Sequence, residues 1–149
     1  MKYRKPNTLE RLMNKTFGFF VGLGLSPSFN YLLEVNGRKS GRTYSHPVNL
    51  MELDGKKYLV ATRGYAQWVR NVEAGGNKAT LSKRSYRQPV LLTPVENELK
   101  PRLIKEYLDR YAVAVQRFFP VKAGSPVEAF YPLASQHPVF EVTTLTQEN

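Results

Sequence analysis

The sequence predicts a mainly β domain of the α+β class, built as a compact antiparallel barrel of about six strands with peripheral helices. Apolar extended segments follow one another across short turns, a pattern typical of hairpins and not of repeated strand–helix–strand units. The 149 residues, 42% hydrophobic and 12% aromatic, are enough to bury one substantial core. No linker or internal repeat is visible, so we expect residues 1–149 to form one domain.

The strands are predicted from extended apolar runs that lie between turn signals. Asp54-Gly55 is the strongest of these signals, because this dipeptide favours the tight turn of a two-residue hairpin. Pro89 has no backbone N–H to donate, so we expect it at an edge of the sheet. The predicted strands cover residues 30–36, 43–52, 56–62, 78–82, 86–95 and 139–145.

A short helix is predicted over residues 66–74. Trp68 and Val72 fall on one face of it, as the inner side of a half-buried helix requires. Gly75 and Gly76 follow directly, and glycine is the usual residue just past a helix end. This helix would therefore connect the third and fourth predicted strands.

A longer helix is predicted over residues 98–119. Apolar side chains recur there at spacings of three and four, which places them on one stripe. Residues 120–138 carry no such period and read as a loop before the last strand. The stripe consists of Leu99, Leu103, Tyr107, Tyr111, Val115 and Phe118.

Residues 1–28 are expected to form an N-terminal helical segment that opens at Thr8. The apolar run over residues 17–25 is too short to span a bilayer. Packing against the barrel is the favoured interpretation, and contact with an anionic membrane surface is the alternative. We therefore expect a cytoplasmic protein. If the segment contacts lipid, the protein would lie peripherally on the inner face of the membrane. The side chains available for such contact are Phe17, Phe19, Phe20 and Leu23.

The charge balance narrows the class of partner. Lysine and arginine number 22 against 12 acidic residues, a net charge of +10. Such a field attracts nucleic acid, anionic lipid or a multiply charged cofactor. A basic cluster around Tyr86 has the composition of a nucleic-acid surface, but basic sheet edges also prevent aggregation, so nucleic acid is disfavoured. The cluster comprises Lys78, Lys83, Arg84 and Arg87.

The chain shows no catalytic apparatus of its own. It has no cysteine, which suits a reducing cytosol, and His46 and His137 lie in no metal-ligand spacing. No nucleophile-elbow motif is present either. No metal site is predicted, and an enzyme built on this chain is expected to take its chemistry from a cofactor.

The most informative motif is the hexapeptide Gly37–Arg42, with sequence GRKSGR. Two glycines allow a tight turn with uncovered amides, while Arg38, Lys39 and Arg42 add fixed positive charge. Such a loop suits a phosphate or carboxylate. A solvated hairpin turn is the alternative that the hexapeptide alone leaves open.

Three segments in order resemble a known family. The hexapeptide is followed by His46-Pro47-Val48 and then by residues 58–64, YLVATRG, which lead into residues 67–76, QWVRNVEAGG. These segments and their order resemble those of the deazaflavin-dependent nitroreductase and quinone reductase family, over about residues 32–95. The resemblance implies a split β-barrel that binds coenzyme F-420, with flavin mononucleotide as the alternative cofactor.

The resemblance also implies which residues hold the cofactor. In relatives the hexapeptide segment contacts the phosphodiester and polyglutamate tail, and the segment at residues 61–64 lies along the cofactor. The loop before Trp68 is shorter here than in many members, and Tyr44 stands where many carry arginine. The implied cofactor-binding residues are Arg38, Lys39, Ser40, Gly41, Arg42, Tyr44, Pro47, Ala61, Thr62, Arg63, Gly64, Trp68 and Asn71.

The implied reaction is hydride transfer between reduced coenzyme F-420 and a hydrophobic, electron-poor acceptor such as a quinone, an enone or a nitro compound. Tyr65 and Tyr131 are the candidate proton donors. A lipid or cofactor carrier without turnover is the main alternative. A flavin mononucleotide protein and a basic nucleic-acid module are weaker ones, and both a monomer and a homodimer stay open.

Overall fold

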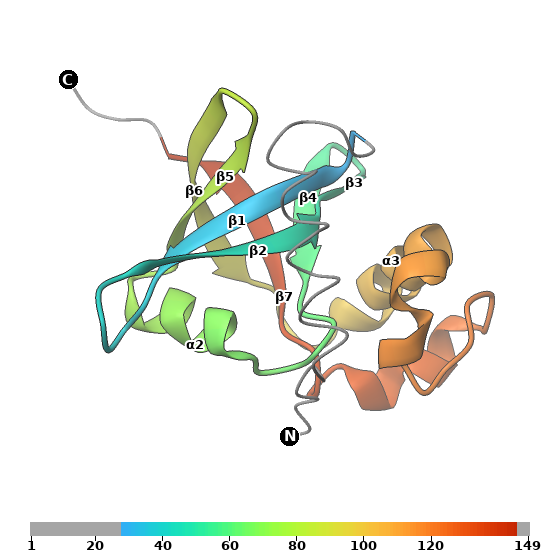
Figure 1. The fold of residues 1–149 in the computed structure, drawn as a ribbon. Helices are drawn as coiled ribbons and strands as arrows, with labels where there is room; N and C mark the ends of the chain where they lie inside the picture. Colours follow the sequence, from blue (N-terminus) through green and yellow to red (C-terminus); the bar gives the residue numbers. More distant parts are fainter. Residues whose placement is uncertain (1–27, 146–149) are drawn as a thin grey trace.

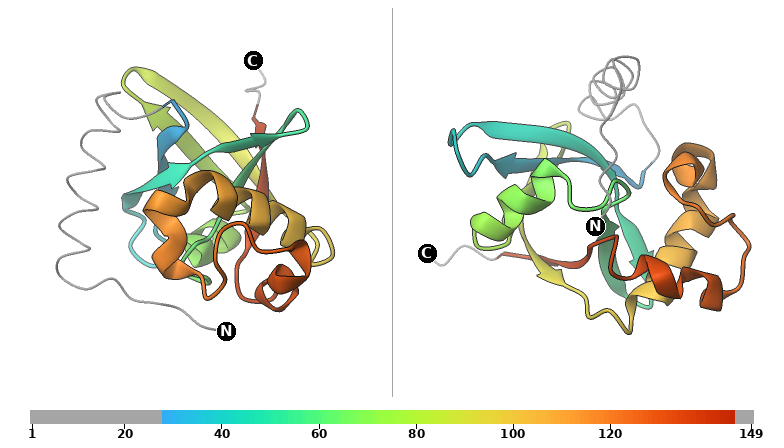
Figure 2. Two further views of the ribbon diagram at one scale, coloured as in Figure 1. Left: turned by 90° about the vertical axis from the view of Figure 1, so that its right-hand side faces the viewer. Right: turned by 90° about the horizontal axis from the view of Figure 1, so that it is seen from below.

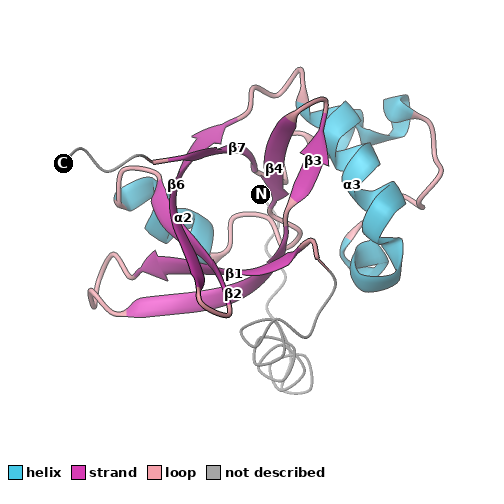
Figure 3. Cartoon of the chain, turned by 90° about the horizontal axis from the view of Figure 1, so that it is seen from above, coloured by secondary structure: helices cyan, strands magenta, loops and turns pink. Residues whose placement is uncertain are grey.

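The computed structural model describes residues 28–145 (Figure 1). Seven antiparallel strands form one sheet in the order β2-β1-β5-β6-β7-β4-β3, curved into a half-barrel (Figure 3). The expected split antiparallel barrel with peripheral helices is therefore confirmed, while the expectations for the N-terminal helical segment fall outside the described residues. The strands are β1 (Asn30–Asn36), β2 (Thr43–Asn49), β3 (Met51–Leu53), β4 (Lys56–Val60), β5 (Lys78–Lys83), β6 (Tyr86–Pro94) and β7 (Val139–Thr144).

Two hydrophobic cores hold the molecule together. In the first, α2 (Gln67–Ala74) buries Val69 and Val72 against the inner face of the half-barrel. In the second, α3 (Lys100–Val115), η1 (Gln116–Phe118) and η2 (Val127–Leu133) pack against β3, β4 and β7. The two helices therefore lie at different ends of the sheet, as the two views of Figure 2 show.

The strand count differs from the expectation because the segment 43–52 is two strands. The break falls at Leu50, whose backbone N–H makes the last bond toward the β1 side, to the carbonyl of Phe29 at 2.8 Å, before the chain changes partner. β2 then pairs with β1, and β3 pairs with β4. The turn between β3 and β4 follows the expected chemistry, since Asp54 and Gly55 both have positive φ angles of 54° and 77°.

The edge position expected for Pro89 is wrong. Pro89 lies in β6, between β5 and β7, and stands opposite Thr80. The register with β7 begins one residue later, at Val90, and the Pro89 carbonyl accepts from the Leu145 N–H at 2.9 Å. The proline thus occupies the end of the β6–β7 ladder, where its missing N–H is tolerated.

The long helix is shorter than expected. Tyr111 has a non-helical backbone within α3, and the chain continues as a 3-10 turn from Gln116. Leu99 is 60% exposed and so does not belong to the apolar stripe. Part of the expected loop 120–138 is η2, which buries Phe130. Within residues 28–145, no helix has the length and apolar composition needed to cross a bilayer.

Candidate functional site

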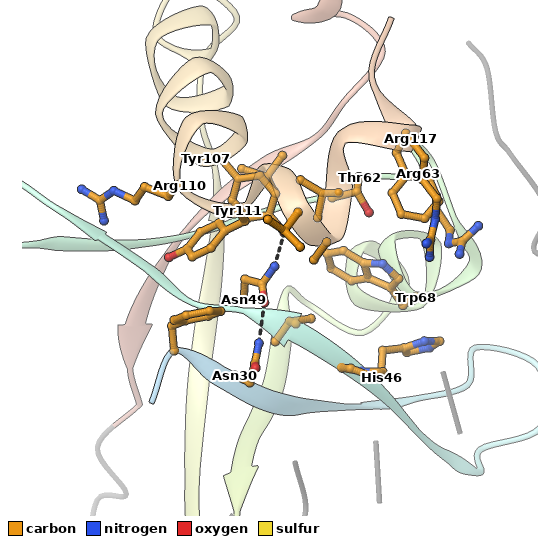
Figure 4. A pocket seen from close by; sticks show the side chains of 18 residues that line it. Asn30, His46, Asn49, Thr62, Arg63, Trp68, Tyr107, Arg110, Tyr111 and Arg117 are labelled. Carbon is orange, nitrogen blue, oxygen red and sulfur yellow. Dashed lines mark hydrogen bonds between the residues drawn. The ribbon is translucent and has the colours of Figure 1, made fainter. Parts of the chain in front are cut away.

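A cavity of about 610 Å³ opens between the sheet and α3 (Figure 4). Its walls come from the end of β2, the segment after β4, the start of α2 and the last part of α3 with η1. This volume falls in the usual range for a small-molecule site. We call it the central cavity; it is lined by Phe29, Asn30, His46, Pro47, Val48, Asn49, Val60, Thr62, Arg63, Trp68, Tyr107, Arg110, Tyr111, Val113, Ala114, Val115, Arg117 and Phe118.

A chain of hydrogen bonds crosses one wall of the central cavity. Asn30 and Asn49 stand opposite each other in the β1–β2 register, and the Asn30 Nδ2 donates to Asn49 Oδ1. The Asn49 Nδ2 in turn donates to the Tyr107 hydroxyl at 3.1 Å. Burial raises the pKa of Tyr107, so its phenol stays protonated at any physiological pH.

Two guanidinium groups stack on one phenyl ring at another wall. Arg63 Cζ lies 4.3 Å and Arg117 Cζ 4.6 Å from the ring centre of Phe118. Figure 4 shows both arginines beside Trp68. Cation–π contact of this kind holds a planar charged group beside an apolar surface. Positive charge and aromatic area therefore meet on this side of the central cavity.

The residues after β4 are held in a fixed turn. The buried His137 Nδ1 lies 2.9 Å from the Ala61 carbonyl, which can only accept, so the ring nitrogen carries the proton. The same carbonyl accepts from the Gly64 N–H, and Gly64 has a φ of 77°. This turn directs Thr62 and Arg63 toward the central cavity while Ala61 packs in the barrel core.

The hexapeptide forms the tip of the β1–β2 hairpin, which we call the basic hairpin. The Gly37 N–H donates to the Arg42 carbonyl at 2.7 Å, and Ser40 Oγ accepts from the Arg42 N–H at 3.2 Å. A Cβ on Gly37 would lie 2.7 Å from the Tyr44 ring, so any other residue there would have to displace the Tyr44 side chain. Lys39 and Arg42 are exposed, and neither has an ion-pair partner within residues 28–145.

Arg38 ties the basic hairpin to α2. Its Nη1 donates to Asn71 Oδ1 at 2.7 Å and its Nη2 to Gln67 Oε1 at 2.9 Å. The Arg38 backbone N–H also donates to Asn71 Oδ1, at 3.1 Å. Gln67 directly precedes Trp68, which lines the central cavity. The basic hairpin and the cavity are therefore joined through the first turn of α2.

The structure brings some of the expected site residues together and separates others. Pro47, Thr62, Arg63 and Trp68 line the central cavity. The basic hairpin, with Ser40 and Tyr44 in hydrogen-bond contact at 3.3 Å, lies at the far end of β2. Asn71 is buried beneath Arg38.

Neither expected proton donor lines the central cavity. Tyr65 is half-buried and packs against the barrel core. Tyr131 is 58% exposed on η2. Sequence reasoning had instead left out polar cavity residues from β1, β2, α3 and η1. These residues are Asn30, His46, Asn49, Tyr107, Arg110, Tyr111 and Arg117.

The two asparagines could have been found from the hairpin register alone. Asn36 and Thr43 flank the turn, so counting back along both strands places Asn30 opposite Asn49. Two amides that face each other at the open end of a hairpin are a signal for a polar site. No local signal connects this pair to Tyr107, which lies 58 residues after Asn49.

Stability is expected to fall when the pH drops below about 6.5. His46 stands opposite the buried Leu33, and burial lowers its pKa below the ordinary 6.5. Burial likewise lowers the pKa of His137. The unfolded chain therefore binds more protons than the folded one just below pH 6.5, which favours unfolding. Urea midpoints at pH 7.5 and 5.5 measure this loss. His46→Gln should lose less stability than the natural chain, and an equal loss in both would contradict the assignment.

The described residues hold no group of three or more His, Asp or Glu side chains that could bind a metal ion. A sequence model of the F-420H(2)-dependent quinone reductase family matches residues 8–123. The chain belongs to this family. The expected resemblance is thereby confirmed, and membership supports F-420-dependent oxidoreduction. No curated protein matches the chain.

Solved structures share the fold of this quinone reductase family member at low sequence identity. An F-420-H2-dependent reductase, FDR-A, is 21% identical over 78% of this chain and 95% of its own, with a TM-score of 0.50. A structure described as a domain-swapped dimer is 22% identical over 91% and 93%, with a TM-score of 0.54. A protein of unknown function from Agrobacterium tumefaciens is 15% identical, also with a TM-score of 0.54. The match covers 78% of the present chain but only 48% of the Agrobacterium protein.

The residues present fit a deazaflavin with an anionic tail. The central cavity offers the aromatic side chain of Trp68 to a planar ring. The basic hairpin offers the exposed cations Lys39 and Arg42 to phosphate or carboxylate groups. An apolar aromatic cavity with charge at one end is the arrangement that such an amphipathic ligand requires.

Proposed function

We propose that this quinone reductase family member transfers hydride from reduced coenzyme F-420 to a hydrophobic quinone. One observation carries the proposal: the aromatic central cavity and the basic hairpin are joined by Gln67 and Trp68, two consecutive residues of α2. Reduced coenzyme F-420 supplies the hydride when bound. One hydride and one proton together convert a quinone into its hydroquinone.

The chain itself binds and orients the reactants. Lys39 and Arg42 hold the anionic tail by charge-assisted hydrogen bonds, while Arg38 fixes the hairpin against α2. Trp68 covers one face of the ring site. The three neighbouring cations therefore have two different roles: Arg38 bonds to the protein, and the other two are left for the ligand.

Water exclusion is the second contribution of the chain. The wall formed by α3 and η1 adds Val115 and Phe118 to the central cavity, opposite β2. Apolar walls of this kind hold a quinone close to the ring and keep water from the reacting atoms. A hydrophobic acceptor matches these walls better than a polar one.

Three further proposals concern assembly and location. A homodimer is supported by the domain-swapped dimer among the structural neighbours, and light scattering would distinguish it from a monomer. Cytoplasmic location and contact of the N-terminal segment with an anionic membrane stay predictions from the sequence. Sedimentation with anionic and neutral liposomes tests the membrane contact, which predicts preferential binding to the anionic ones.

Coenzyme F-420 is expected to bind more tightly than flavin mononucleotide. Both ligands carry a planar ring and a phosphate, but only coenzyme F-420 has the longer anionic tail that reaches additional cations. Quenching of Trp68, the only tryptophan of the chain, reports both titrations. Equal or tighter binding of flavin mononucleotide would contradict the cofactor assignment.

A further inference from the structure

The hydrogen-bond chain in the central cavity ends on the Tyr107 hydroxyl, a donor for which the described residues provide no acceptor. Asn30 donates to Asn49, and Asn49 donates to the oxygen of Tyr107. The Tyr107 O–H is the last donor in this direction, and no acceptor for it occurs within residues 28–145. Tyr107 is only 3% exposed and lines the cavity. Its hydroxyl hydrogen is therefore available to a ligand in the central cavity.

Such a donor is costly to leave unpaired and strong when it is paired. A buried hydroxyl without an acceptor carries a desolvation penalty, which a ligand removes by accepting from it. In addition, a hydroxyl that already accepts a bond becomes a better donor, because the bonds along a chain polarise one another. The two asparagines thus prepare Tyr107 to bind an acceptor oxygen.

We propose that the Tyr107 hydroxyl binds a carbonyl oxygen of the acceptor and thereby selects conjugated carbonyl compounds, quinones above all. This inference rests on the proposed function and deepens it. Tyr107 supplies the specificity that apolar walls alone lack, since those walls accept a hydrocarbon of the same shape equally well.

The position of Tyr107 favours the acceptor over the cofactor as its ligand. Tyr107 belongs to α3, whereas the basic hairpin lies at the opposite end of the sheet (Figures 1 and 2). A cofactor held by its anionic tail at the basic hairpin would enter the central cavity on the side of Trp68. The side of α3, where Tyr107 and Asn49 meet, would then be left for the acceptor.

Quinone binding to the cofactor-free and the cofactor-saturated protein tests this inference. The probes are 2-methyl-1,4-naphthoquinone and, as the matched ligand without carbonyls, 2-methylnaphthalene. Trp68 quenching follows binding in the cofactor-free protein, and equilibrium dialysis follows it in the presence of oxidised coenzyme F-420. The chain contains no cysteine, so thiol addition to the quinone does not interfere.

Tyr107→Phe is expected to weaken quinone binding about five- to tenfold and to leave hydrocarbon binding unchanged, because only the hydroxyl is lost. Retained hydrocarbon binding shows that the cavity is intact. Tyr86→Phe is the matched control, since Tyr86 is 49% exposed and lies outside the central cavity. It should bind both probes like the natural chain.

Asn49→Asp provides a second variant in which the Tyr107 hydroxyl is kept. One carboxylate oxygen still accepts from Asn30, and the other accepts the Tyr107 hydrogen, which is then lost to the ligand. Quinone affinity should fall as in Tyr107→Phe. Unchanged quinone affinity in both variants would overturn the inference and would mean that Tyr107 donates to Asn49.

The cofactor arm separates this inference from the proposed function. If Tyr107→Phe weakens binding of coenzyme F-420 and not of the quinone, the hydroxyl serves the cofactor and the inference is overturned. If the natural chain binds the quinone with the expected dependence on Tyr107 but does not bind coenzyme F-420, the inference about the carbonyl site stands and the proposed function fails.

Discussion

The double variant Lys39→Ala/Arg42→Ala is expected to bind coenzyme F-420 at least tenfold more weakly than the natural chain and to unfold at the same temperature. Each charge-assisted hydrogen bond to an anionic tail is worth about 1.5–3 kcal/mol. Both side chains are exposed at the tip of the basic hairpin and pair with no acidic group in the described part of the chain. Their loss therefore affects the ligand and not the fold.

A charge-matched control separates local contact from the general field. Lys57→Ala/Lys122→Ala removes two exposed cations elsewhere, so it lowers the net charge of +10 by the same two units. Titrations at several salt concentrations should show a reduced salt dependence in both double variants but a tenfold loss only in the hairpin variant. Equal losses in the two would mean that the basic hairpin is a solvated turn.

Arg38 behaves differently because it is part of the fold. Its guanidinium bonds to Asn71 and Gln67, and Asn71 is 7% exposed. Arg38→Ala leaves the Asn71 carbonyl oxygen with the Arg38 backbone amide alone. This variant should therefore lose thermal stability as well as affinity, in contrast to the Lys39 and Arg42 pair.

The role of Arg38 shows how far the sequence could be interpreted. Its neighbours in the chain favoured an anion site, because the hexapeptide combines three cations with two glycines. The groups that Arg38 actually contacts lie 29 and 33 residues further along the chain. Local composition could therefore not distinguish the cation that bonds to α2 from the two that have no ion-pair partner in the described part of the chain.

The sheet was predictable where turns are short. Asp54-Gly55 and the glycines of the basic hairpin fix their strand pairs by turn chemistry. The closure of the half-barrel was not predictable, because β7 lies between β6 and β4 and pairs with residues far away in sequence. Leu50 continues the apolar pattern of its strand, so only the change of pairing partner from β1 to β4 reveals the break.

The central cavity was predictable from the sequence only in the part that comes from the family motif. Trp68, Thr62 and Arg63 belong to the motif that carries the family resemblance, and they line the central cavity. Tyr107 looked like one more member of an apolar stripe, and it is indeed buried. That its hydroxyl meets Asn49 follows from the packing of α3 beside β2, which no spacing in the sequence encodes.

Transfer of hydride to a quinone is the central claim, and it requires the protein to hold both reactants together. Reacting atoms must lie roughly 3–3.5 Å apart, with water kept away. The central cavity provides apolar walls for this purpose beside the basic hairpin. A carrier with the same barrel would bind both ligands without bringing them into this geometry.

Stopped-flow absorbance under single-turnover conditions measures hydride transfer to the quinone directly. Reduced coenzyme F-420, bound to the protein, is mixed with a lipophilic 1,4-naphthoquinone, and the reduced cofactor is followed as it disappears. The rate is expected to exceed the protein-free rate by at least about 100-fold, since positioning alone can supply far more than this. If binding is established by titration and the reduced cofactor is consumed no faster than in free solution, the protein is a carrier and the oxidoreductase assignment is wrong.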